Sequence, residues 1–256
     1  MNWSEKLEIF ISDFEHMGDA IGILVCGSYV TGSPSKHSDL DVHIVLDNRA
    51  EYRERGNKII DGFLIEYFAN PPRQILKYFE EDIREKSLMC QTQFATGKIM
   101  LDKTGDVAAL KEKALTMIED FYKGADDNPT MTGISKYFLW DMLDDLQDAY
   151  ETQRPDFDLL YFNSLNRIVG EYMRCIGRTY HYKTIFGNIT DDTVRRKYLL
   201  RELPDAKISS LIAAAITAVG RKEKLDNYQM LTETIIDRFG GFDIDGFKLK
   251  SALDLG

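Results

Sequence analysis

The chain has 256 residues, of which 44% are hydrophobic and 29% are charged, so it is long enough to bury a core and to form two domains. Its formal net charge of −10 argues against a protein that binds nucleic acid by neutralising phosphates, and among charged ligands it favours a cationic small molecule. Cys26, Cys90 and Cys175 follow no metal or redox spacing, and no apolar segment reaches membrane-spanning length, so we expect a cytoplasmic protein with reduced thiols.

Helical and strand patterns alternate irregularly over the first hundred residues. Two apolar runs joined by Asp61-Gly62 are typical of a two-residue hairpin, and the charged stretch 51–55 before them is interpreted as a loop or a helical turn. We therefore expect an α+β domain with a mixed sheet over residues 1–105. Its predicted elements are a helix over 4–17, strands over 21–25 and 39–46, a hairpin over 58–68, a helix over 70–86 and a strand over 98–101.

From residue 106 onward the periodicity is helical throughout. Apolar stripes at three- and four-residue spacing alternate with short loops, which is typical of an antiparallel bundle. We expect an all-α, substrate-binding domain over residues 106–256. Its predicted helices cover 107–121, 135–152, 157–177, 191–203, 206–220 and 222–239.

The most informative stretch is a turn between two apolar runs. Gly27-Ser28 follows the first run, a glycine-broken loop and a short helix come next, and Asp39 and Asp41 open the second run. Residues two apart on a strand project to one face, so the two carboxylates are presented together. Paired carboxylates beside a turn with free backbone amides suit a magnesium-nucleotide site. His43 shares their face, and we interpret it as a half-buried structural residue.

The spacing of this stretch resembles a known signature. Gly-Ser, three residues, Gly, five residues and Ser-Asp-x-Asp are similar to the motif of the polymerase-beta-type nucleotidyltransferase superfamily, and within it to bacterial aminoglycoside nucleotidyltransferases. The resemblance implies that Gly27 and Ser28 hold the triphosphate with Ser38 close by, and that Asp39 and Asp41 hold Mg²⁺. A surface loop with a solvated Asp pair is the alternative interpretation.

A further carboxylate lies inside the second arm of the hairpin. Glu66 interrupts the apolar run 63–68, where burial is costly unless a cation meets the charge. It is either an exposed residue of an edge strand or, as the resemblance implies, the third carboxylate of the site. In that role it joins the metal ligands and accepts the proton of the acceptor hydroxyl.

One helix of the second domain carries an acidic face. Like charges at these helical spacings repel by a few tenths of a kcal/mol per pair, roughly, and a cationic substrate would relieve the repulsion. A solvated acidic face is the alternative. The residues of this face are Asp141, Asp144, Asp145 and Asp148.

A basic and aromatic cluster follows a predicted helix end in the second domain. In the enzymes that the chain resembles, a lysine of the helical domain reaches the phosphates, and Lys183 is the candidate here. The alternative is a basic residue that stabilises a helix C-terminus.

The resemblance implies an adenylyltransferase with ATP as co-substrate and Mg²⁺ as cofactor. The resemblance implies transfer of AMP to a hydroxyl of an aminoglycoside-type antibiotic with release of pyrophosphate, which would confer antibiotic resistance. Two alternatives stay open: modification of a protein or RNA partner, as in toxin–antitoxin nucleotidyltransferases, and a non-catalytic nucleotide-binding module. Acidity and the lack of a basic tract argue against a template-directed polymerase.

Overall fold

The computed structural model describes residues 3–32, 34–124 and 129–250, and these form two compact units. The first unit extends to Gly124 and includes Lys197–Leu199, and the second contains the remainder. Helix α5 (Asp106–Lys123) belongs to the first unit because it packs against β1, β5 and α4. The compact units therefore divide at Gly124, whereas we expected the domain boundary at residue 105.

The first unit is built on a five-stranded sheet with the strand order β3-β4-β2-β1-β5. Strands β2 and β4 are parallel neighbours, and the other pairs are antiparallel, so the predicted mixed sheet and the α+β class are confirmed. The strands are β1 (Ala20–Cys26), β2 (Leu40–Leu46), β3 (Glu54–Ile60), β4 (Phe63–Asn70) and β5 (Lys98–Asp102).

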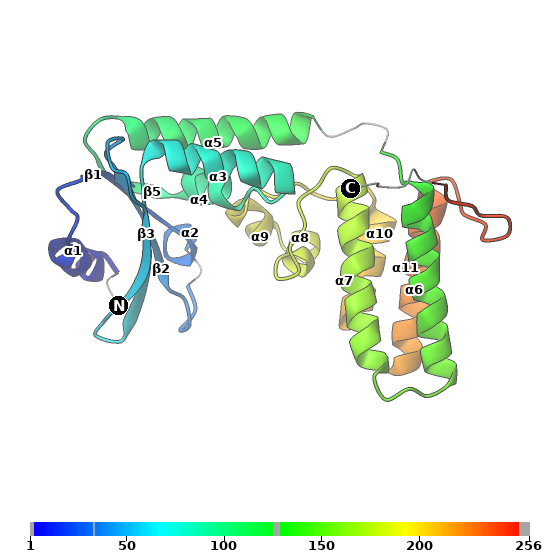
Figure 1. Cartoon of the computed structure of the whole chain (residues 1–256). Coiled ribbons are helices and arrows are strands. Elements are labelled where there is room, and N and C mark those ends of the chain that lie inside the picture. Colours follow the sequence, from blue (N-terminus) through cyan, green and yellow to red (C-terminus); the bar gives the residue numbers. More distant parts are fainter. Residues whose placement is uncertain (1–2, 33, 125–128, 251–256) are drawn as a thin grey trace. The chain divides into compact units, whose positions relative to one another are not determined.

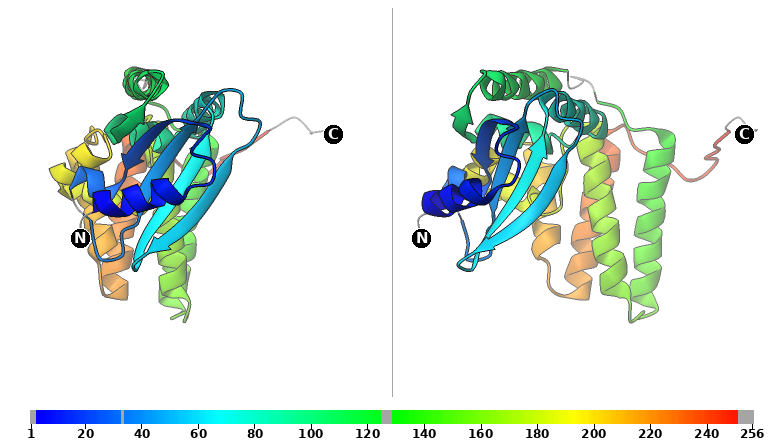
Figure 2. Two further views of the ribbon diagram at one scale, coloured as in Figure 1. Left: turned by 90° about the vertical axis from the view of Figure 1, so that its left-hand side faces the viewer. Right: turned by 60° about the vertical axis from the view of Figure 1, so that its left-hand side comes forward.

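Helices cover both faces of this sheet (Figures 1 and 2). Alternate residues of β2 point to opposite faces, so Val42 and Ile44 pack with α1 (Trp3–Asp13) while Val45 packs with the other helices. The second face is covered by α5 together with α3 (Pro72–Glu85) and α4 (Met89–Thr96). The short helix α2 (Ser28–Thr31) follows β1.

Some elements of the first unit differ from the sequence-based expectation. Strand β3 begins at Glu54, within the stretch expected to be a loop, because its register with β4 continues to the pair Glu54 and Ala69. Helix α4 was not expected, since its eight residues carry no clear amphipathic stripe. Helix α1 ends at Asp13, and turns replace the predicted continuation to residue 17.

The second unit is an all-helical bundle. Its core is formed mainly by α6, α7, α10 and α11, whose buried apolar residues make one cluster, as the bundle prediction requires (Figure 1). Helix α8 was not expected, and α9 is shorter than the predicted helix over 191–203. No described helix is long and apolar enough to cross a membrane. The helices are α6 (Gly133–Glu151), α7 (Phe157–Cys175), α8 (Ile185–Thr190), α9 (Asp192–Lys197), α10 (Ala206–Thr217) and α11 (Arg221–Arg238).

Candidate active site

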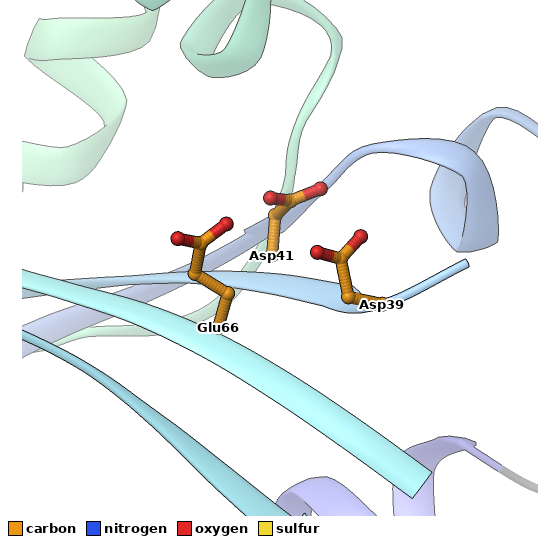
Figure 3. Close-up of side chains that lie close together, drawn as sticks. All are labelled: Asp39, Asp41 and Glu66. Carbon is orange, nitrogen blue, oxygen red and sulfur yellow. The ribbon is translucent and has the colours of Figure 1, made fainter. Parts of the chain in front are cut away.

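Three carboxylates converge at one end of the sheet (Figure 3). Asp39 immediately precedes β2, Asp41 lies within β2, and Glu66 is its register partner on the parallel strand β4. One oxygen of each carboxylate lies within 4.8 Å of the others, and all three residues are partly buried. The sequence predicted the pairing of Asp39 and Asp41, and the structure brings Glu66 to them.

The cluster is electrostatically strained in the absence of a cation. Burial, together with the nearby charges of Asp39 and Glu66, raises the pKa of Asp41 from 3.8 to about 6. A divalent cation between the oxygens would offset both effects. Hard carboxylate oxygens at this mutual distance fit Mg²⁺, which binds through a few carboxylates together with substrate phosphates. The residues present therefore fit the implied metal.

A glycine turn lies beside Asp41. Gly27 has a φ of +77°, which L side chains rarely adopt, and a Cβ added to it would overlap Oδ2 of Asp41. Its carbonyl accepts hydrogen bonds from the amides of Val30 and Thr31 and from the Thr31 hydroxyl, which holds α2 against the end of β1. Glycine at this position thus allows the backbone to approach the carboxylates closely.

Ser38 takes part in the loop that leads to the first carboxylate. Its hydroxyl accepts a hydrogen bond from the Ser35 amide at 2.9 Å, and its own amide donates to the Ser35 carbonyl at 3.1 Å. These bonds close a turn directly before Asp39. They give Ser38 a structural role, and the phosphate-binding roles of Gly27, Ser28 and Ser38 stay predictions.

Glu66 has a partner that the sequence interpretation missed. Arg55 donates from Nη2 and Nε to Oε1 of Glu66 at 2.6 and 3.1 Å, and its guanidinium lies 4.9 Å from the ring centroid of Phe68. The arginine side chain is 70% exposed, so the ion pair contributes at most about 1 kcal/mol to stability. Its consequence is to orient the carboxylate. Counting outward from Asp61-Gly62 in hairpin register would have placed Arg55 opposite Phe68.

The remaining candidate residues belong to the second unit. Asp141 on α6 is partly buried and accepts a hydrogen bond from the Tyr137 hydroxyl at 3.4 Å. Three carboxylates further along the same helix are exposed, namely those of Asp144, Asp145 and Asp148. Lys183 is also exposed, and its Nζ lies 5.9 Å from the ring centroid of Tyr182. Their roles toward a substrate stay predictions.

A mixed sheet that carries a carboxylate triad beside a glycine turn defines a domain suited to metal-assisted chemistry on nucleotide phosphates. Residues 7–95 match the family model described as "Nucleotidyltransferase domain". This stretch of the chain is therefore similar to a nucleotidyltransferase domain, in agreement with the motif resemblance. Transfer of a nucleoside monophosphate is the activity class that this domain supports.

A solved structure of a nucleotidyltransferase-like protein from Exiguobacterium sibiricum 255-15 is similar with a TM-score of 0.44 and 9% sequence identity, over 93% of this chain and 77% of that chain. No curated protein matches the chain.

Proposed function

We propose that the protein transfers AMP from ATP to a hydroxyl group of a small molecule of the aminoglycoside type and releases pyrophosphate. The observation that carries the proposal is the convergence of Asp39, Asp41 and Glu66 beside the turn at Gly27. A domain that only bound a nucleotide would not require three carboxylates so close together that the charges of two of them raise the pKa of the third.

Each residue of the site has a defined task in this reaction. Backbone amides at Gly27 and Ser28 bind the triphosphate, and Asp39, Asp41 and Glu66 hold Mg²⁺. The bound cation supplies charge neutralisation for the phosphates and the leaving pyrophosphate.

Bond formation then follows an in-line path. The acceptor oxygen forms a bond to the α-phosphorus, the bond from the α-phosphorus to the bridging oxygen breaks, and pyrophosphate leaves with the electron pair. The carboxylate of Glu66 accepts the hydroxyl proton. Arg55 keeps that carboxylate in one orientation through its two hydrogen bonds.

The acceptor class is proposed from charge and from the motif resemblance. The chain carries a formal net charge of −10, which favours encounter with a polycationic small molecule and disfavours nucleic acid. The acidic face of α6 is a candidate contact for amino groups, and Lys183 is a candidate contact for the phosphates.

The test is pyrophosphate release from magnesium-ATP in the presence of individual aminoglycosides. Asp41→Asn removes one metal ligand, and Glu80→Gln on the exposed side of α3 is the matched control. Antibiotic-dependent release that persists in the control and disappears in Asp41→Asn supports the proposal. Release with no aminoglycoside, but with a protein or RNA acceptor, would refute the acceptor class. Metal-dependent ATP binding with no release for any acceptor would refute the transferase assignment.

A further inference from the structure

A pocket of about 510 Å³ lies within the first unit, between the strands β3 and β4 and the helices α3 and α4. Its lining includes two stacked aromatic rings, those of His43 and Phe68, whose centroids lie 5.2 Å apart. Ile75 and Met89 add apolar surface from the two helices. These side chains offer flat and apolar surfaces against which the ring carbons of a small molecule can pack.

Arg55 connects the pocket to the carboxylate triad, whose own three residues are not part of the lining. His43 is two residues after Asp41 on β2, and Phe68 is two residues after Glu66 on β4, so these pairs share one face of the sheet. Arg55 lines the pocket and also donates to Glu66. A molecule in the pocket is thus separated by one residue, Arg55, from the carboxylate proposed to accept the hydroxyl proton.

The order of the strands places this pocket on the side from which the acceptor must approach. The phosphate-binding turn at Gly27 follows β1, whereas Glu66 is on β4, and β2 with Asp41 lies between them. In-line transfer requires the attacking oxygen and the leaving pyrophosphate to lie on opposite sides of the phosphorus. With pyrophosphate at Gly27, the acceptor approaches from the side of β4 and β3, and residues of both strands line the pocket.

The charged groups around the pocket divide into two sets. Two charged groups at the start of β3 are already partnered: Arg53, directly before the strand, donates to the Tyr78 hydroxyl, and Glu54 accepts from the Tyr67 hydroxyl. Helix α3 contributes three further carboxylates to the lining, from Glu81, Asp82 and Glu85.

The α3 carboxylates retain capacity for a ligand. Oδ2 of Asp82 accepts from the Cys90 amide, and Glu81 forms only a long ion pair, at 3.9 Å, with Lys77. Glu85 is exposed. The helix therefore adds negative charge to a lining that also has aromatic and apolar surfaces.

We infer that this pocket binds the acceptor, a hydroxylated organic cation whose amino groups face the α3 carboxylates while one hydroxyl reaches Glu66. The inference rests on the proposed function and assigns acceptor binding to the nucleotidyltransferase unit itself. Under this arrangement the acidic face of α6 is not needed for acceptor affinity.

The experiment is isothermal titration calorimetry with kanamycin, a polyhydroxylated polyamine, and separately with magnesium-ATP. The pocket variant is Glu81→Gln/Glu85→Gln. The matched control Glu80→Gln/Glu112→Gln removes the same charge from exposed positions outside the pocket. The steric variant Met89→Trp fills the pocket from a side chain that is 64% exposed, so the core is left intact.

We expect the pocket variant to raise the Kd for kanamycin about tenfold, the effect of losing two partly exposed ion pairs, and the steric variant to weaken binding similarly. The control variant should bind kanamycin like the parent chain, and the pocket variants should retain their affinity for magnesium-ATP.

Three results would overturn the inference, and they separate it from the proposed function. If Asp144→Asn/Asp148→Asn weakens kanamycin binding while the pocket variants do not, the pocket assignment fails and the proposed function stands. If the pocket variants weaken magnesium-ATP binding instead, the pocket holds the nucleotide. If kanamycin neither binds nor supports pyrophosphate release, the proposed acceptor class fails together with the inference.

Discussion

Replacing Asp41 by Asn should stabilise the first unit when no metal is bound. The pKa of Asp41 is raised from 3.8 to about 6 by burial and by Asp39 and Glu66, so the folded state holds this proton more tightly than the unfolded state. Protonated Asp41 adds to the free energy of unfolding. This contribution is fully present below pH 3.8 and is lost as the pH rises through about 6. Near neutral pH the charged Asp41 therefore opposes folding.

The magnitude follows from the shift. A rise of roughly two units in the pKa of Asp41 corresponds to about 3 kcal/mol in the free energy of unfolding. We take about half of that value, ~1.5 kcal/mol, because Asp41 is partly exposed and solvent screens the charges. Asn has nearly the same volume as Asp and carries no charge. The variant should gain this free energy of unfolding near pH 8 and almost none near pH 4.

Urea denaturation in EDTA measures the difference. A Trp140→Phe background leaves Trp3 as the tryptophan reporter, which lies in the first unit, and Glu80→Gln controls for the loss of an exposed charge. Mg²⁺ should then stabilise the parent chain and leave the Asp41→Asn variant nearly unchanged. Equal or lower stability of the variant near pH 8 in EDTA would refute the argument that the triad is strained without a cation.

Three further substitutions test the turn, the arginine contact and the bundle core. Gly27→Ala places a side chain at a φ of +77° and against Asp41. We expect the free energy of unfolding, measured by urea denaturation, to fall by about 1–3 kcal/mol, and ATP binding, measured by calorimetry, to weaken. Unchanged stability would contradict a strained turn. Arg55→Met should change stability by less than about 1 kcal/mol but slow pyrophosphate release roughly tenfold, and an equal rate would exclude an orienting role for its contact with Glu66. Lys224 is buried, and its ammonium lies over two aromatic rings of α7. Lys224→Ala should therefore lower the free energy of unfolding of the second unit by about 2 kcal/mol. Denaturation followed by Trp140 fluorescence measures this change. A cost near zero would show that the lysine only fills space.

The local part of the site was predictable from the sequence. Asp39 and Asp41 are two residues apart, so strand periodicity alone puts both carboxylates on one face. Asp61-Gly62 fixes the turn of the hairpin and with it the register of both arms, which the structure confirms. The same register would have extended β3 to Arg55, but the charged composition of residues 51–55 favoured a loop.

The non-local part depended on how the strands pair. Glu66 meets Asp41 because β4 lies parallel to β2, and the sequence offers no direct signal for the pairing of strands that are not joined by a hairpin. The resemblance to a known family indicated Glu66, and the tertiary structure shows how close it lies to Asp39 and Asp41. Helix α4 and the pocket beneath it were not predicted, because they depend on packing between segments far apart in the chain.

The sequence by itself indicated the glycine turn, the paired aspartates and the helical bundle, since these are local properties of the chain. Tertiary structure decided which carboxylates share one site, that the guanidinium of Arg55 contacts Glu66, and how far the pKa of Asp41 is raised. Those properties depend on burial and on distances between side chains, and both arise only when the strands and helices pack together.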